Sequence, residues 1–180
     1  MKSEVIYYQN AALTIRSMRE SDIQTLLEAF HAQGWEKPVA VLKKYYTEDL
    51  SELRRVFVAE WNRKLAGYTT VMKEDMHGPF AFNGVPYISD FNVFIPYQRH
   101  GIGSKIMDAA ERFAFERHDS VCLGVGLHKG YGSAQRMYAK RGYIPDGSGV
   151  WYRNQPSEEG APVFNDDDLV LYMTKQRPNT

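Results

Sequence analysis

The spacing of apolar and polar residues changes several times along the chain, and each change predicts a new element. Residues 13–16 alternate as a short strand does, whereas Ile23, Leu26 and Phe30 recur at the spacing of one helix face. Ser21 is the expected N-cap of that helix. By these criteria we expect strands at residues 13–16, 55–61, 65–72, 87–95, 121–125, 150–153 and 169–174, and helices at 21–34, 38–50, 103–117 and 133–140.

The order of these elements is typical of a mixed α/β protein and not of a doubly wound nucleotide-binding fold. Residues 73–86 contain Gly78 and Pro79 and show no clear period, so we expect a long loop, either one that covers a site or a flexible insertion. A chain of 180 residues with 43% hydrophobic content can bury one sizeable core. We therefore expect a single domain over residues 1–180.

Charge and cysteine content narrow the classes of partner. Basic and acidic residues number 22 each, so no net field attracts nucleic acid or a membrane surface. A single cysteine, Cys122, excludes an intramolecular disulfide and argues against a cysteine-based zinc site, so we expect no metal. The chain shows neither a signal-peptide core nor a membrane-length apolar run. These features predict a cytoplasmic protein that acts on a small molecule.

A glycine-containing turn between the strand at 87–95 and the helix at 103–117 is the clearest candidate for chemistry. Its residues are Gln98, Arg99, His100, Gly101, Ile102, Gly103 and Ser104. Glycines let the backbone approach a ligand closely, and a helix N-terminus favours an anion such as pyrophosphate. A dinucleotide fingerprint would need a glycine at Ile106, and a P-loop would need glycine before the lysine. Both of these alternatives are excluded.

The turn resembles the acetyl-CoA pyrophosphate loop of the GNAT acetyltransferase superfamily, whose pattern is Arg/Gln-x-x-Gly-x-Gly/Ala. A second motif, Ala134-x-x-Met137-Tyr138-x-x-x-Gly142-Tyr143, resembles the later helix of that family, Ala-x-x-Leu-Tyr-x-x-x-Gly-Phe. The likeness covers about residues 13 to 175. It implies the GNAT fold, an α/β architecture with a mixed, mostly antiparallel central sheet and helices on both faces.

The resemblance also implies where the co-substrate acetyl-CoA binds. The implied contacts are Phe91, Val93, Gln98, Arg99, His100, Gly101, Ile102, Gly103, Ser104, Ser133 and Ala134. Amides of the turn would hold the pyrophosphate, and the backbone near Phe91 and Val93 would bind the pantetheine arm and the acetyl carbonyl as an oxyanion site. Tyr138 would protonate the leaving thiolate.

Two residues depart from the family pattern. Tyr131 stands where the family often has an asparagine that contacts pantetheine, and Ser133 is the alternative polar contact. Ser89 stands where relatives that acetylate polyamines carry a glutamate that helps to accept the amine proton. Asp90 is then the best candidate base, although strand alternation would point it away from the site. A water chain or a partly neutral amine would serve instead.

The acceptor is the less defined half of the expected reaction. Trp35, Tyr45 and Tyr46 are candidates because the early helices line the acceptor pocket in this family, although isolated aromatics suit a core equally well. We expect an N-acetyltransferase that moves acetyl from acetyl-CoA to a small primary amine by direct attack in a ternary complex. A protein amine is the alternative acceptor, and a non-catalytic acyl-CoA sensor is the alternative function. A homodimer is expected only by analogy with relatives.

Overall fold

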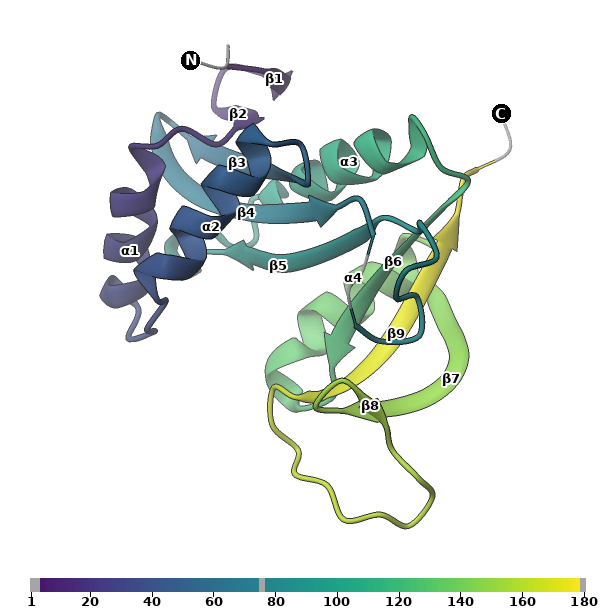
Figure 1. Cartoon of the computed structure of the whole chain (residues 1–180). Coiled ribbons are helices and arrows are strands. Elements are labelled where there is room, and N and C mark those ends of the chain that lie inside the picture. Colours follow the sequence, from purple (N-terminus) through teal and green to yellow (C-terminus); the bar gives the residue numbers. More distant parts are fainter. Residues whose placement is uncertain (1–3, 75–76, 179–180) are drawn as a thin grey trace. The chain divides into compact units, whose positions relative to one another are not determined.

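The computed structural model describes residues 4–74 and 77–178. The chain divides into two compact units, one of residues 1–72 and 89–113, the other of residues 73–88 and 114–180. The central strand β5 (Tyr87–Val93) begins in the second unit and ends in the first. The predicted mixed α/β class and the mostly antiparallel sheet are both confirmed (Figure 1).

The strands of the first unit are hydrogen-bonded in the order β1-β2-β3-β4-β5, and its helices are α1, α2 and most of α3. Besides β5, the elements are β1 (Ile6–Gln9), β2 (Leu13–Ser17), α1 (Asp22–Ala32), α2 (Val39–Leu50), β3 (Arg54–Trp61), β4 (Lys64–Met72), the 3-10 turn η1 (Ile95–Tyr97) and α3 (Ile102–Phe115).

Helices cover both faces of the sheet in this unit. Val56 and Val58 of β3 share a core with residues of α1 and α2. Phe57, between them, points to the opposite face and meets Phe113 of α3 at a ring-centroid distance of 5.7 Å. Because both faces are covered, the centre of β3 is one continuous buried run without polar alternation.

A buried arginine joins β2 to the start of α1. Arg16 is 2% exposed, and its guanidinium donates to both carboxylate oxygens of Asp22 at 2.7 and 2.8 Å and to Glu60 of β3. Asp22 also accepts the backbone N–H of Arg19. Ser21 occupies the predicted N-cap position, but its side chain makes no capping hydrogen bond. The acidic side chain one residue later anchors the start of this helix.

The second unit contains the start of β5 and the end of α3, and its strands follow the order β5-β6-β9-β7-β8. Tyr87 of β5 pairs with Cys122 of β6 in a parallel register, whereas β9 is antiparallel to both β6 and β7. The elements are β6 (Ser120–Gly126), the 3-10 turn η2 (Lys129–Tyr131), α4 (Gly132–Lys140), β7 (Ile144–Tyr152), β8 (Gln155–Pro156) and β9 (Leu169–Gln176).

Most predicted elements are present, and the differences lie in short or irregular strands. The prediction contains neither β1 nor β8, and β7 begins at Ile144 instead of residue 150. Gly147 and Gly149 have φ values of 90° and 82°, and the β7–β9 register shifts between Pro145 and Val150. The strand period is therefore interrupted. Across residues 4–74 and 77–178 no helix is long and apolar enough to cross a membrane.

Gly67 of β4 lies directly against the backbone of β5. A Cβ at this position would overlap the carbonyl oxygen of Asn92 and lie 3.0 Å from Cα of Val93. Backbone atoms within a sheet cannot move aside as the end of a flexible side chain can. The absence of a side chain at Gly67 is therefore required for this approach of β4 to β5.

We predict that Gly67→Ala lowers the free energy of unfolding by about 1–3 kcal/mol, the usual cost of overpacking. Urea denaturation measures this change. Gly132→Ala is the control, because Gly132 has helical dihedral angles and a Cβ there would come no closer than 3.8 Å to another residue. Equal stability of Gly67→Ala and the native chain would contradict the close approach.

Candidate active site

The predicted pyrophosphate turn connects η1 to α3 in the first unit. Arg99 and Gly101 have φ values of 67° and 76°, and α3 begins at Ile102. Two contacts brace the turn: the Gln98 amide donates to the Val93 carbonyl at 3.0 Å, and the His100 ring bonds the Gln98 carbonyl at 2.8 Å. The N–H groups of a first helical turn have no partner inside the helix, so this end of α3 is suited to an anion.

The start of α3 is packed against the central strand. A Cβ on Gly103 would lie 3.0 Å from Phe91 Cζ and 3.4 Å from Val93 Cγ2, so these two side chains lie on the α3 face of β5. A Cβ on Gly101, by contrast, would meet nothing within 4 Å. Phe91 and Val93 thus lie against the start of α3, and the space beside Gly101 is open.

Asp90 of β5 is the centre of a polar cluster that the sequence did not reveal. One of its carboxylate oxygens, Oδ2, accepts the Tyr68 hydroxyl at 2.6 Å and lies 2.5 Å from Nζ of Lys37. The other oxygen accepts the Asn92 amide at 2.9 Å. Lys37 lies between α1 and α2, and Tyr68 lies on β4. The α1–α2 connection, β4 and β5 itself thus supply hydrogen-bond donors to a single carboxylate.

Aromatic rings complete this Asp90 cluster. Nζ of Lys37 lies 5.6 Å from the ring centroid of Phe30 and 5.8 Å from that of Tyr45. Burial, followed by the charge of Asp90, raises the pKa of Tyr45. Burial and then Asp90 likewise raise the pKa of Tyr68, which is fully buried. Both hydroxyls are therefore neutral near pH 7 and can act as hydrogen-bond donors.

The other two acceptor candidates, Trp35 and Tyr46, lie in the same unit. Trp35 is 47% exposed, and its ring is 6.3 Å from that of Phe30. Tyr46 is partly buried against the α1–α2 core. Trp35 therefore reaches the Asp90 cluster through Phe30, whereas Tyr45 contacts Lys37 of that cluster directly.

Ser89 belongs to a second polar network on the same face of the sheet. Its hydroxyl lies 2.9 Å from that of Thr70. It also accepts a hydrogen bond of 3.4 Å from the Arg54 guanidinium. Arg54 donates to Glu48 at 2.7 Å and stacks over the Tyr45 ring at 4.3 Å. The residue that replaces the family glutamate therefore faces an arginine that already has an acidic partner.

The second unit holds Ser133, Ala134 and Tyr138 on α4. Tyr138 is 5% exposed, its ring is 5.8 Å from that of Tyr143, and burial raises the pKa of its hydroxyl. Gln135 ties the helix to the end of β6 by donating to the Gly126 carbonyl at 2.9 Å. Tyr138 is therefore a neutral, positioned hydroxyl, as a proton donor must be.

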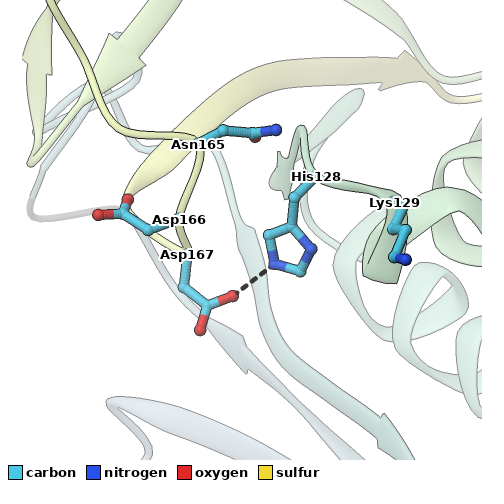
Figure 2. Close-up of a pocket in the computed structure, with 5 residues that line it drawn as sticks. All are labelled: His128, Lys129, Asn165, Asp166 and Asp167. Atoms are coloured by element: carbon cyan, nitrogen blue, oxygen red, sulfur yellow. Dashed lines mark hydrogen bonds and ion pairs between the residues drawn. The ribbon is translucent and has the colours of Figure 1, made fainter.

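Tyr131, which also departs from the family pattern, contacts a residue that lines a surface pocket of the second unit. The pocket is lined by His128, Lys129, Asn165, Asp166 and Asp167. Figure 2 shows His128 and Asp167 pointing toward each other, with Nε2 and Oδ1 2.9 Å apart. The Tyr131 hydroxyl donates to the same oxygen at 3.1 Å, and the bond from His128 lowers the pKa of Asp167.

The contacts of His128 limit its chemistry. Its Nδ1 accepts the N–H of Gly130 at 3.1 Å, so the proton of the neutral ring must be on Nε2, facing Asp167. Neither nitrogen of this ring is then open to accept a substrate proton. His128 therefore holds the Asp167 side chain beside η2.

The turn, Asp90 and Tyr45 are predicted from the sequence, whereas the partners of Asp90, namely Lys37, Tyr68 and Asn92, are not. The i, i+2 spacing of Asp90 and Asn92 on one strand was an available signal, because it places both on one face. Nothing in the local sequence pointed to Lys37 or Tyr68. In the described part of the chain no group of three or more His, Cys, Asp and Glu side chains could hold a metal ion.

Comparison with known proteins identifies the class. A model of the acetyltransferase (GNAT) family matches residues 20–143, which is more than half of the chain. The chain therefore belongs to the GNAT family and is an N-acetyltransferase, as the turn and the α4 motif predicted. No curated protein sequence matches it.

Solved structures share the fold at low sequence identity. An acetyltransferase from Salmonella typhimurium that modifies the N-terminal serine of a 50S ribosomal subunit protein has a TM-score of 0.71 and 12% identity, with 97% of this chain and 100% of that chain covered. A spermidine N-acetyltransferase SpeG chimera from Vibrio cholerae and hSSAT has a TM-score of 0.65 and 15% identity, with 92% of this chain and 96% of that chain covered. The structure of Salmonella typhimurium yncA with its cofactor acetyl-CoA has a TM-score of 0.64 and 17% identity, with 92% of this chain and 94% of that chain covered.

We predict that Tyr68→Phe lowers the free energy of unfolding at pH 7 by about 1–3 kcal/mol, because a buried bond to a charged group is lost. The difference should shrink above pH 10. Native Tyr68 keeps its proton where unfolded tyrosine loses it, so its contribution decreases by about 1.4 kcal/mol per pH unit. Urea unfolding of both chains between pH 7 and 11 measures the difference. A constant difference would contradict the raised pKa.

Proposed function

We propose that this acetyltransferase uses acetyl-CoA and transfers the acetyl group directly to the primary amine of a small acceptor. The proposed acceptor rests on one observation, the ion pair between Asp90 and Lys37. Oδ2 of Asp90 lies 2.5 Å from Nζ of Lys37. A carboxylate that already binds a primary ammonium beside two aromatic rings has the chemistry to bind the ammonium of an acceptor. The two charged side chains are 19% and 16% exposed, so a small molecule can reach them.

The glycine turn supports the donor half of the proposal. The open space beside Gly101 allows phosphate oxygens to approach the N–H groups at the start of α3. Phe91 and Val93 lie against that helix start and are the proposed contacts of the pantetheine arm. Ser133 and Ala134 of α4 are proposed contacts from the second unit. The likeness in fold to yncA, whose structure contains acetyl-CoA, supports the same donor.

In the proposed reaction, each proton has a named destination. Asp90 accepts a proton from the acceptor ammonium, and the neutral amine attacks the acetyl carbon. The C–N bond forms as the C–S bond of the thioester breaks, and backbone N–H groups of β5 stabilise the negative carbonyl oxygen. Tyr138 gives its proton to the departing sulfur, and the second proton that the nitrogen loses as the amide forms returns through solvent to the Tyr138 oxygen. Asp90 then releases its proton to solvent. The Tyr138 hydroxyl is protonated at neutral pH, as this role requires.

The nature of the acceptor rests on this chain's own residues. Two proteins of the same fold act on unlike acceptors, the N-terminal serine of a ribosomal protein in one case and spermidine in the other. Asp90 and Lys37 are four-fifths or more buried, and two aromatic rings lie next to the ammonium. Such an enclosed pair favours a small amine over the amine of a folded protein.

We predict that Gly101→Val weakens acetyl-CoA binding at least tenfold, because a branched side chain would fill the space proposed for the pyrophosphate. Isothermal titration calorimetry measures the affinity. Gly160→Val is the matched control: Gly160 has a φ of 77° against 76° at Gly101, and a Cβ at either position meets nothing within 4 Å. Unchanged affinity in Gly101→Val, or equal losses in both variants, would place the pyrophosphate elsewhere.

We also predict that Tyr138→Phe lowers kcat about 100-fold, because the ring remains while the proton donor to sulfur is lost. Release of free thiol from acetyl-CoA over a panel of amines measures the rate. Tyr143→Phe is the control, since it removes a hydroxyl from the neighbouring ring. Native activity in Tyr138→Phe would exclude this role. If the native chain binds acetyl-CoA but releases no thiol with any amine, the proposed function is wrong.

A further inference from the structure

Lys37 is the one cation in direct contact with the proposed base among the described residues. Its ammonium lies 2.5 Å from Oδ2 of Asp90 and faces the rings of Phe30 and Tyr45 at 5.6 and 5.8 Å. The residue lies in the segment that joins α1 to α2, immediately before Pro38. A side chain with four flexible carbons on such a segment can move its charge without any change in the sheet.

Asp90, by contrast, is held in place. The Tyr68 hydroxyl and the Asn92 amide each donate to one of its oxygens, and both partners belong to the sheet. When the Lys37 ammonium moves away, these two neutral donors remain. The carboxylate therefore stays oriented and available for a new cation, while Lys37 becomes available for a new anion.

The charges around this pair are balanced. The positive charge of Lys37 offsets the negative charge of Asp90. The nearby Arg54 guanidinium stacks on the Tyr45 ring at 4.3 Å and forms an ion pair with Glu48 at 2.7 Å. A ligand that adds a positive and a negative charge together preserves this balance, because one ion pair is replaced by two. A diamine would bring two positive charges and leave Lys37 without a counter-ion.

We propose that the acceptor is a small zwitterion, an amine that carries a carboxylate or another anionic group a few bonds away. Its ammonium replaces that of Lys37 on Asp90, and its anionic group binds Lys37. Because Nζ and Oδ2 are in direct contact, the two charges of the ligand must lie close together, as they do in short amino acids. This assignment rests on the proposed function and names the substrate class of the same site.

Three amines of matched length test the assignment: γ-aminobutyrate, n-butylamine and putrescine end in a carboxylate, a methyl group and an ammonium, respectively. Glycine and β-alanine, with ethylamine and propylamine, extend the comparison to shorter chains. The measured quantity is kcat/KM from thiol release. We expect the amino acids to exceed the matched alkylamines at least tenfold, and putrescine to be the poorest of the three four-carbon amines.

Substitutions at Lys37 then test its part in this preference. Lys37→Met should reduce the amino acids to the level of the alkylamines, and Lys37→Glu should make putrescine the best four-carbon substrate. Lys37→Met keeps the aliphatic part of the side chain. It therefore still tests the role of the charge if Lys37→Glu impairs folding. Lys43→Glu is the matched control, because Lys43 is an exposed lysine of α2 and the change in charge is the same. The native preference should persist there.

The outcomes separate the two proposals. Equal kcat/KM for the matched amines, or a preference that survives Lys37→Met, would overturn the zwitterion assignment and leave acetyl transfer to small amines intact. Acetylation of diamines alone would overturn it as well. If peptides with free N-termini are acetylated while every small amine fails, both the assignment and the small-molecule acceptor are wrong. No thiol release with any amine or peptide would overturn the proposed function itself.

Discussion

The left-handed backbone at Asp90 is the constraint on which the geometry of the first unit's site depends. A non-glycine residue with a φ of 51° inside a central strand costs about 1–3 kcal/mol unless its surroundings hold it. Here the bonds from Tyr68, Asn92 and Lys37 do so. The result is that Ser89 and Asp90, which are neighbours in sequence, both face the side of the sheet covered by α1 and α2, while the residues that follow resume the alternation toward α3.

Local patterns were sufficient to predict the glycine turn and the helices around it, because each depends on residues close together in the chain. The prediction failed where distant segments meet. Lys37 and Asp90 are 53 residues apart and Tyr68 and Asp90 are 22 apart, so only tertiary packing brings them together. The alternation rule placed Asp90 on the wrong face, because a single positive φ in the strand reverses the rule and no pattern in the sequence marks it.

The second unit shows the same division between local and distant information. The α4 motif was recognisable at helical spacing, and the structure presents Tyr138 as a buried neutral hydroxyl. The role of Tyr131 was not predictable, because its partner Asp167 is 36 residues away. Strands β7 and β8 were missed in whole or in part, because glycines interrupt the first and the second has only two residues. The expectation of a single domain over the whole chain stays a prediction.

The position of Lys37 has a consequence for how such an enzyme changes. The side chain that would select among amines lies on a connecting segment, whereas the carboxylate that would take the proton is fixed within the sheet. Connecting segments tolerate substitution more readily than central strands do. A lineage of this protein could therefore exchange one class of acceptor for another by a single codon change, with its acetyl donor and its proton acceptor left as they were.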